Sequence, residues 1–219
     1  MKKQVDKDHY KFSEYLTKAR WASVWHQLDE VMKFKPARVL EIGPGPGIFK
    51  SAAKTFGLNV ETLDVDPELN PDYVASIFSM PFKDNEIDVV CAFQVLEHLP
   101  YDKSLQAFAE MVRISKTGVV ISLPDAKRVW PMTIHIPKIG TANMLIPRPF
   151  LRLQTHDFDG EHYWEINKIG YALDKLIKDF KVMDCQLIRT YRVFWNPYHR
   201  FFIFSKQVEN SPSSTDKTA

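Results

Sequence analysis

The chain has 219 residues, of which 45% are hydrophobic and 26% charged, as in an ordinary globular protein, and its net charge of +2 gives no general attraction to nucleic acid or anionic membranes. No apolar run approaches the ~18 residues of a membrane span, and no signal core follows the basic start. Cys91 and Cys185 match no metal or redox spacing, so we expect the protein in the reducing cytoplasm. We expect one domain over residues 1–206, followed by a polar, disordered tail over residues 207–219.

The first predicted element is a helix within residues 8–34. Five apolar side chains recur there at helical spacing, and they are Trp21, Val24, Trp25, Leu28 and Met32. We expect this face to pack on the main domain, which makes the helix an N-terminal extension of that domain.

A glycine-rich turn follows a short apolar strand predicted at residues 39–42. Gly43, Gly45 and Gly47 occupy every second position, and residues 49–54 then have the pattern of a helix. Glycine is needed in such a turn because a side chain would hold a ligand away from the backbone, and because the turn visits positive φ. Strand, turn and helix together predict the opening of a nucleotide-binding βαβ unit.

The residues around this turn indicate which ligand it binds. Ile48 stands where a dinucleotide fingerprint has its third glycine, and Glu41, just before the turn, would repel a pyrophosphate. That carboxylate suits a ligand with an adenosine, a sulfonium and an ammonium but no phosphate, which is S-adenosylmethionine. Asp64 follows at the ~20-residue spacing of a carboxylate that binds ribose hydroxyls, whereas Asp66 precedes a proline and better fits a turn cap.

Short apolar segments predict the next strands of the sheet. They lie at residues 58–63, 73–75, 87–93 and 118–123, and a helix is expected over residues 101–114. Because strands and helices alternate, the sequence predicts an α/β fold with a Rossmann-like, doubly wound sheet that has helices on both faces.

Residues 125–161 interrupt this alternation. The segment contains several prolines and a basic excess from Lys127, Arg128, Lys138, Arg148 and Arg152. A long irregular insert in a compact domain is usually functional. Because it leaves the sheet beside the expected acceptor site, we interpret it as a substrate lid. Its basic residues either favour an anionic small-molecule acceptor or form a solvated face.

The densest group of acids and imidazoles lies at the end of this insert. It comprises His156, Asp157, Asp159, Glu161 and His162, which match no known ligand spacing, so we expect no metal ion. The following Tyr163 and Trp164 are either walls of an acceptor pocket or buried aromatics at a helix start.

The C-terminal part predicts one more helix and two more strands. The helical face comprises Ile169, Leu173, Leu176, Ile177 and Phe180 and is expected to pack on the sheet. Residues 181–189 and 201–204 predict the sixth and seventh strands, and the aromatic residues at positions 195–199 are expected to form a turn without an assigned role.

Four motifs in order resemble those of a known family. They are the turn from Glu41 to Gly47, Asp64, residues 80–82 and residues 95–98. On these motifs the chain resembles class I S-adenosylmethionine-dependent methyltransferases, and in particular small bacterial methyltransferase-domain proteins. The resemblance implies a seven-stranded, mostly parallel sheet with an antiparallel last strand, and S-adenosylmethionine as cofactor.

The resemblance also implies cofactor contacts beyond the turn and Asp64, namely Val65, Ser76, Ile77, Phe93 and Gln94. Ser76 stands where the family usually has an acid that binds the adenine amino group, so its hydroxyl or the Ile77 backbone is expected to accept that bond. Phe93 is expected to cover the sulfonium, and Gln94 to bind the cofactor's backbone. The N-terminal helix of this family often closes over the pocket, and the candidates to line it are Tyr10, Tyr15, Arg20 and Trp21.

Two histidines are candidate general bases. His98 lies in the motif beside the acceptor, and its ordinary pKa is close to neutral, although a histidine there also fits a bond to a backbone carbonyl. His162 belongs to a His-x-x-Glu stretch that related small methyltransferases carry.

The sequence therefore predicts a methyltransferase that acts on a small molecule. One alternative is a binding module that keeps the cofactor pocket without catalysis. The other is a nicotinamide-dependent oxidoreductase, against which Ile48 and Glu41 argue. A nucleic-acid substrate is not expected, because the motif that base-modifying enzymes often carry after the fourth strand is missing and the chain has no strong basic field.

Overall fold

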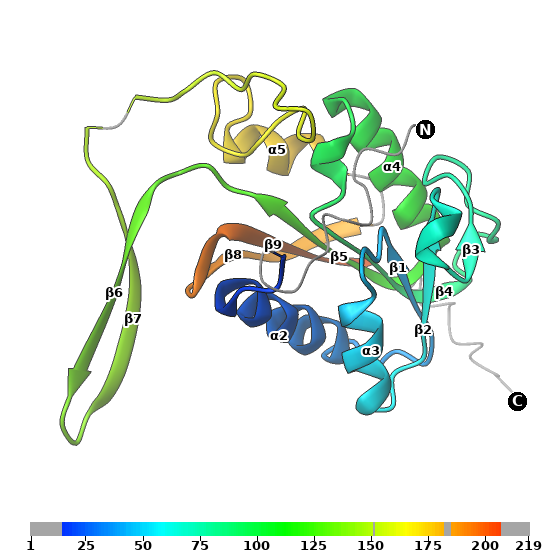
Figure 1. Cartoon of the computed structure of the whole chain (residues 1–219), viewed down its shortest axis with the longest axis horizontal. Coiled ribbons are helices and arrows are strands. Elements are labelled where there is room, and N and C mark those ends of the chain that lie inside the picture. Colours follow the sequence, from blue (N-terminus) through cyan, green and yellow to red (C-terminus); the bar gives the residue numbers. More distant parts are fainter. Residues whose placement is uncertain (1–14, 151, 182–184, 207–219) are drawn as a thin grey trace, which may run out of the picture.

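The computed structural model describes residues 15–150, 152–181 and 185–206, and a seven-stranded sheet forms its centre (Figure 1). The strands are β1 (Val39–Ile42), β2 (Val60–Asp64), β3 (Tyr73–Val74), β4 (Ile87–Phe93), β5 (Ser115–Pro124), β8 (Cys185–Val193) and β9 (Asn196–Lys206). Their order is β3-β2-β1-β4-β5-β9-β8, and β9 alone is antiparallel to its neighbours. The predicted seven-stranded, mostly parallel sheet is confirmed.

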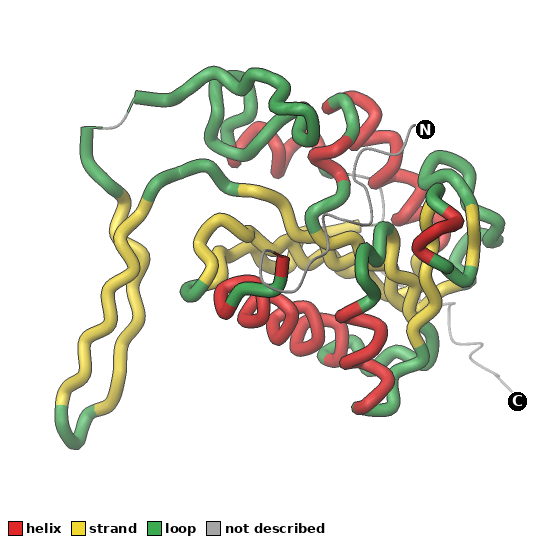
Figure 2. The backbone as a smooth tube through the Cα atoms, in the orientation of Figure 1, coloured by secondary structure: helices red, strands yellow, loops and turns green. Residues whose placement is uncertain are grey.

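Helices cover both faces of this sheet, as predicted (Figure 2). The helices are α2 (Lys18–Met32), α3 (Ile48–Thr55), α4 (Tyr101–Ile114) and α5 (Leu173–Asp179), with short 3₁₀ turns η2 (Pro67–Leu69) and η3 (Leu96–His98). One apolar core joins the sheet to α2 and α3, and the other joins it to α4 and α5.

Alternate residues of a strand contribute to the two cores. In β1, Val39 belongs to the core under α2 and α3, whereas Leu40 and Ile42 belong to the opposite core. Since successive side chains of a strand point to opposite faces, Glu41 points toward the same face as Val39. This places a carboxylate on the α2 side of the sheet, directly before the glycine turn.

The helix α2 confirms the predicted N-terminal extension, but the predicted buried face is right only in part: Val24 is buried and Leu28 packs against the core, whereas the other three residues are exposed. Trp21, Trp25 and Met32 are 53%, 59% and 42% exposed. The buried residues are Ser23, Val24, Gln27, Glu30 and Val31. Glu30 can be buried because Arg189 and Tyr191 of β8 donate hydrogen bonds to its carboxylate. Hydrophobic periodicity ignores such polar partners, so it leaves out the buried Glu30 and includes the exposed Trp21 and Trp25.

Residues 129–147, about half of the insert at residues 125–161, are not irregular. They form an antiparallel hairpin of β6 (Val129–Ile136) and β7 (Gly140–Pro147), which is a separate two-stranded sheet that projects from the body (Figure 1). Lys138 and Gly140 have φ of 68° and 124°, which turns the chain at the tip. We call this hairpin the arm. Because many of its apolar residues are exposed, the arm lacks the pattern of a half-buried strand and resembles a loop in the sequence.

The C-terminal predictions are confirmed in part. The helix α5 is shorter than the predicted face, since Ile169 lies outside it and is 54% exposed, while Leu176 and Phe180 are buried. Tyr198 and His199 lie in β9 rather than in a turn. Tyr10 and the predicted tail at residues 207–219 lie outside the described residues. Among the helices that the structure describes, none has the length and apolar character required to cross a bilayer.

Candidate functional site

The glycine turn joins β1 to α3 and exposes its backbone at the carboxyl edge of the sheet. Gly43, Gly45 and Gly47 have φ values of 65°, 53° and 72°, a left-handed conformation that favours glycine. A Cβ atom at Gly43 would lie 2.7 Å from Cγ2 of Val95, so a larger residue there must displace that side chain. The N–H of Gly43 donates to the carbonyl oxygen of Leu63 at 3.0 Å, which ties the turn to β2.

Glu41 is the buried carboxylate of this turn. It is 4% exposed, and its Oε2 atom has no hydrogen-bond partner among the described residues. Burial raises the pKa of Glu41 to about 8, and the charge and backbone N–H of Lys50 moderate that rise. A cation bound beside Glu41 would return it to the ionised form.

Two cavities share Gly43 in their lining. The first, which we call the Glu41 cavity, is lined by Tyr15, Arg20, Val24, Gln27, Glu41, Gly43, Pro44, Pro46, Ile48, Phe49, Phe93, Gln94 and His199. The second, the Asp64 cavity, is lined by Ile42, Gly43, Leu63, Asp64, Val65, Ala75, Ile77 and Val95. The first is rich in polar and charged groups and the second is mostly apolar, with one carboxylate.

The structure places Asp64 and Asp66 in different roles. Asp64 lies at the end of β2 in the Asp64 cavity, where its Oδ1 accepts the Asp66 N–H at 2.9 Å. Burial raises the pKa of Asp64, partly offset by backbone N–H donors. Asp66 instead caps η2 by accepting the N–H of Glu68 at 3.0 Å. Asp66 is thus a turn cap, and Asp64 stays the predicted ribose ligand.

Residues 75–77 present an apolar wall rather than a polar one. Ala75 and Ile77 line the Asp64 cavity, as does Val65, whereas Ser76 does not. The Ser76 hydroxyl accepts the N–H of Phe78 at 3.3 Å within its own turn. Of the predicted adenine contacts, Ile77 is therefore positioned at the cavity, and the Ser76 hydroxyl is occupied locally.

Phe93 ends β4, Gln94 follows it, and both line the Glu41 cavity, as their predicted roles require. The Phe93 ring lies 5.2 Å from the Phe49 ring in an edge-on arrangement. Gln94 has φ of 59°, which is uncommon for a side-chain-bearing residue, and its Nε2 donates to Oγ of Ser122 at 3.1 Å. Such conformations concentrate at functional sites.

The N-terminal segment contributes two of its predicted residues to the Glu41 cavity. Tyr15 and Arg20 line it, and the guanidinium carbon of Arg20 lies 4.1 Å from the centre of the Tyr15 ring. Trp21 is not part of the lining. The helix α2 therefore packs on the sheet and also walls the cavity, so the two interpretations of this segment are compatible.

His98 and His162 lie together but line neither cavity. Their ring centres are 5.0 Å apart. Nδ1 of His98 lies 3.0 Å from the carbonyl oxygen of Glu161, and Nδ1 of His162 lies 3.1 Å from Oε1 of Glu165. Burial and the neighbouring His162 lower the pKa of His98. Burial also lowers the pKa of His162. Its hydrogen bond to Glu165 and the charge of Glu97 raise that pKa by more than burial lowers it, so the net shift is upward. The backbone bond expected for His98 is present, and a role as base stays a prediction for both.

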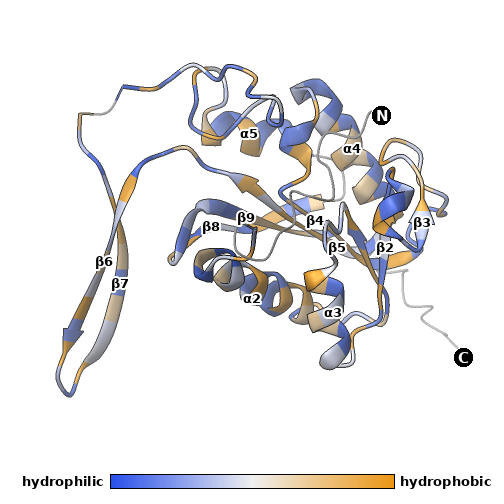
Figure 3. Cartoon of the chain, viewed as in Figure 1, coloured by the Kyte–Doolittle hydropathy of each residue, from blue (hydrophilic) through white to orange (hydrophobic). Residues whose placement is uncertain are grey.

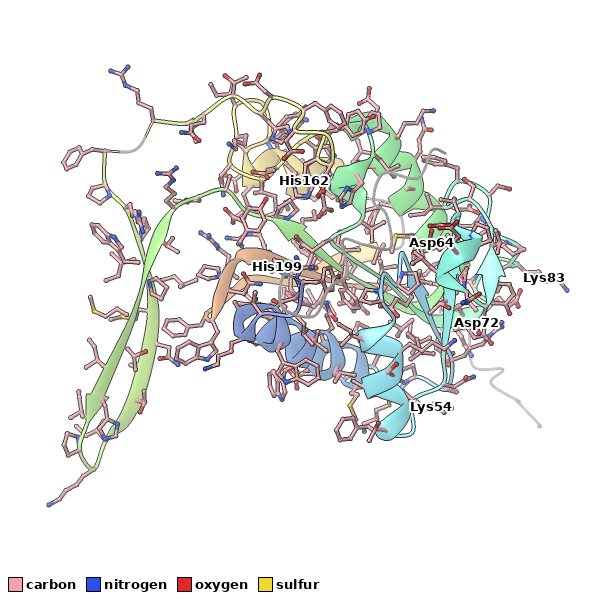
Figure 4. The ribbon with its side chains drawn as sticks, viewed as in Figure 1. Lys54, Asp64, Asp72, Lys83, His162 and His199 are labelled. Atoms are coloured by element: carbon pink, nitrogen blue, oxygen red, sulfur yellow. The ribbon has the colours of Figure 1, made fainter. Side chains whose placement is uncertain are left out.

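Sequence reasoning missed His199. This residue of β9 lines the Glu41 cavity, is 5% exposed, and has no partner for its Nδ1 atom within the described residues. Burial lowers its pKa to about 3, and the positive charge of Arg20 acts in the same direction. Figure 4 shows His199 close to α2 and His162 on the α5 side. The signal in the sequence was the alternation of His199 with the buried Phe201, which marks a strand.

A basic pocket lies at the base of the arm. It has a volume of about 200 Å³ and is lined by Ala126, Lys127, Arg128, Arg148, Arg152, Leu153, Gln154, Asn167 and Lys168. Four of the five basic residues of the predicted lid meet there, and no acidic side chain lines the pocket. Lys138 is the exception, because it lies at the tip of the arm.

Comparison with known proteins identifies the family. The chain matches the family described as "Methyltransferase domain" over residues 12–169. An uncharacterised methyltransferase of Mycobacterium tuberculosis strain H37Ra is 29% identical in an alignment 109 residues long that covers 44% of this chain and 42% of that protein. One of Mycobacterium sp. strain JLS is 32% identical in an alignment 112 residues long that covers 47% of this chain and 43% of that protein. The aligned part is less than half the length of these relatives.

Solved structures share the fold at low sequence identity. A Pyrococcus horikoshii protein has a TM-score of 0.60 at 13% identity, covering 93% of this chain and 100% of that chain. The 1,6-didemethyltoxoflavin-N1-methyltransferase of Burkholderia thailandensis, solved with 1,6-didemethyltoxoflavin and S-adenosylhomocysteine, has a TM-score of 0.56 at 14% identity, covering 87% and 78%. The family match spans most of the chain and the sheet has the same architecture. The chain therefore belongs to the methyltransferase domain family and has the class I, S-adenosylmethionine-dependent methyltransferase fold.

Proposed function

We propose that this chain is an S-adenosylmethionine-dependent methyltransferase that acts on an anionic small molecule. The observation that carries the proposal is the Glu41 carboxylate, which is buried at the glycine turn with an unpartnered oxygen. A buried carboxylate of this kind is stabilised by a cation and would repel a pyrophosphate. S-adenosylmethionine brings an ammonium and a sulfonium and no phosphate.

The two cavities divide the cofactor between them. In this proposal the methionine part occupies the Glu41 cavity, where Glu41 receives the ammonium and Arg20 pairs with the carboxylate. The adenosine part occupies the Asp64 cavity, where Asp64 binds the ribose hydroxyls and Ile77 packs against the adenine. Gly43 belongs to both cavities, so the bare backbone there lies under the junction of the two parts.

The chemistry requires positioning more than it requires acid–base groups. The cofactor, when bound, supplies a methyl group on a positively charged sulfur. The chain must hold donor and acceptor in line, which removes ~7–11 kcal/mol of barrier in well-oriented reactions. Phe93 and Phe49 provide apolar surface in the Glu41 cavity and exclude water there. A base is needed only where the acceptor is a hydroxyl or an ammonium.

Three histidines are placed to serve an acceptor at this edge of the sheet. His98 and His162 remain the candidate bases, because His98 follows the carboxyl end of β4 and the His162 ring lies 5.0 Å from it. His199 is already neutral at pH 7 and offers a hydrogen-bond acceptor inside the Glu41 cavity. Its low pKa makes it a weak base, so in this proposal it orients groups rather than removing a proton.

The basic pocket supports the anionic character of the acceptor. Lys127, Arg128 and Arg148 are among five cationic side chains that converge there without an acidic partner in the lining. Arginine forks suit carboxylate and phosphate groups. Ala126 and Lys127 of this pocket come two and three residues after the end of β5, and that end, Pro124, pairs with His199 of the Glu41 cavity.

Calorimetric binding of adenosylhomocysteine and of NAD tests the cofactor assignment. We expect adenosylhomocysteine to bind and NAD not to bind, with affinity for the former reduced at least tenfold in Glu41→Gln and Asp64→Asn. Asp66→Asn is the matched control and should bind as the wild type does, because Asp66 caps a turn. Tighter binding of NAD would replace the proposal with an oxidoreductase.

Methyl transfer itself is tested with a panel of carboxylate-bearing and phosphate-bearing acceptors. Transfer to a member of the panel, with a higher KM in Arg128→Gln, is the expected result. Binding of adenosylhomocysteine without transfer to any acceptor would favour the binding module instead.

A further inference from the structure

Glu97 is a second buried carboxylate, far from the glycine turn in sequence. It is 0% exposed, and neither of its side-chain oxygens accepts a hydrogen bond from another described residue. A buried carboxylate without a partner is costly and requires either a proton or a cation. The groups around Glu97 indicate which of the two it takes.

Two imidazoles meet this carboxylate. One ligand atom each from Glu97, His98 and His162 lies within 4.8 Å of the other two. A transition metal with bonds of ~2.0–2.2 Å holds its ligand atoms roughly 3–3.5 Å from one another, a separation that lies within this limit.

Hydrogen bonds orient both imidazoles as metal-bound histidines are oriented. Each Nδ1 faces an oxygen acceptor, the Glu161 carbonyl for His98 and the Glu165 carboxylate for His162. These acceptors favour the Nδ1–H tautomer, which leaves the lone pair on Nε2. A metal-binding histidine almost always donates its second nitrogen to a carbonyl or carboxylate in this way. The Tyr198 hydroxyl donates to the same Glu165 oxygen and fixes it in turn.

The backbone already holds the two contributing segments together. The N–H of Tyr163 donates to the carbonyl oxygen of Glu97 at 2.8 Å. Beside it, Trp164 is fully buried, and its indole N–H donates to Leu99 at 3.1 Å and to Ser104 at 3.0 Å. The segment with His162 is thus fixed against η3, so the three side chains are positioned before any ion arrives.

We propose that Glu97, His98 and His162 form a binding site for a divalent transition metal of the Zn²⁺ type. Two imidazoles and one carboxylate form a donor set that zinc accepts while keeping positions for further ligands. The adjacent group of Asp159, His162 and Glu165 is the competing arrangement. It is less suited, because Asp159 already accepts the backbone N–H groups of Glu161 and His162, and Glu165 is engaged by His162 and Tyr198.

The predicted absence of a metal rested on the spacing of residues 156–162. The proposed site takes only His162 from that group and draws its other two ligands from η3, which no local spacing reveals. A bound ion would occupy the Nε2 atoms of His98 and His162, so zinc binding at this site would remove both residues as candidate bases.

Zinc titration of chelator-treated protein, followed by calorimetry and by elemental analysis after gel filtration, tests the site. We expect one Zn²⁺ per wild-type chain, a rise in Tm on binding, and affinity at least tenfold lower in Glu97→Gln and in His162→Asn. Because Glu97→Gln keeps the shape of a neutral side chain, it should fold, which circular dichroism checks. Co²⁺ in place of Zn²⁺ should give a visible absorption band that Glu97→Gln loses.

Asp159→Asn and Asp157→Asn are the controls, and both should bind zinc as the wild type does. Loss of binding in Asp159→Asn with retention in Glu97→Gln would move the ion to the competing group and overturn the proposal. So would a folded wild-type chain that binds no Zn²⁺ or Co²⁺. Unchanged binding of adenosylhomocysteine in Glu97→Gln keeps this result separate from the cofactor assignment.

Discussion

The central sheet and the arm both contain apolar strands, but only the sheet buries them. Leu40 and Val90 are 0% exposed, because helices cover both faces of their strands. In the arm, Met132 and Ile134 are 39% and 41% exposed. Figure 3 shows hydrophobic residues along the arm, where none of the described helices lies against them.

The register of the arm gathers these residues on one face. Trp130 pairs with Ile146, Met132 pairs with Met144, and Ile134 follows two positions later on the same side. A two-stranded hairpin alone is marginally stable in water. Apolar residues of the sheet therefore pack in a core, whereas those of the arm form exposed contact surface and contribute little to the stability of the fold.

The largest expected effect comes from the sheet's core. Phe108→Ala on α4 removes a ring that is 0% exposed and packs against Phe180 and Phe204. We expect the free energy of unfolding to fall by about 3–5 kcal/mol, because the cavity cannot close around so rigid a cluster. Urea titration measures it. A loss below about 1 kcal/mol would show that the sheet does not depend on this packing.

An effect of similar size, but one that depends on pH, is expected at Glu41, the one carboxylate of β1. Burial raises the pKa of Glu41 to about 8, above the ordinary 4.5 of the unfolded chain. Folding therefore favours the neutral form of Glu41. The contribution of Glu41 to the free energy of unfolding is greatest below pH 4.5 and is lost as the pH rises toward 8. Between these values the free energy of unfolding falls by about 1.4 kcal/mol per pH unit.

Glu41→Gln removes this dependence. Without ligand, the variant should match the wild type near pH 4.5 and exceed it by a few kcal/mol at pH 8, while binding adenosylhomocysteine poorly. Chemical denaturation at several pH values gives the difference. Parallel curves for the two proteins would mean that Glu41 is ionised throughout, and that the sheet tolerates a buried charge.

Gly43→Ala should have an intermediate effect. The new Cβ would meet Val95 at 2.7 Å, and the φ of 65° is unfavourable for alanine, so we expect a loss of about 1–3 kcal/mol together with weaker adenosylhomocysteine binding. Gly47→Ala shares the positive φ but meets no atom within 4 Å, and it serves as the control for backbone strain alone. Equal losses in both variants would discount the contact with Val95.

The smallest effect is expected in the arm. Ile134→Ala should change the free energy of unfolding by less than about 0.5 kcal/mol, because the side chain is exposed and opposite Ala142. Urea titration beside Phe108→Ala provides the measurement. A loss comparable to that of Phe108→Ala would end the contrast between the two regions.

Much of the fold was predictable because buried strands have a clear pattern. The strand at Ile87–Phe93 and the helix at Tyr101–Ile114 were predicted to the residue. The failures have a common cause, which is that pattern reasoning assumes apolar residues are buried. In α2 the polar Glu30 is inside and Trp25 is outside, and in the arm a regular exposed hairpin stands where an irregular backbone was expected.

The residues of the candidate site also fall into a group that the sequence predicted and a group that it did not. Glu41, Asp64 and the glycines are close in sequence and belong to one βαβ unit, so their spacing was informative. His199 and Glu97 reach their sites through β9 and η3, by contacts between distant parts of the chain. No local spacing records such contacts.

The position of β9 also has a consequence for synthesis on the ribosome. The edge of β5 pairs with β9, whose residues are translated about eighty positions later, and β8 joins the sheet only through β9. A nascent chain that stops before Asn196 therefore leaves the hydrogen-bonding edge of β5 open and the wall at His199 missing. Completion of the sheet and of its ligand crevice must then be among the last events of folding, since contacts of such long range form slowly.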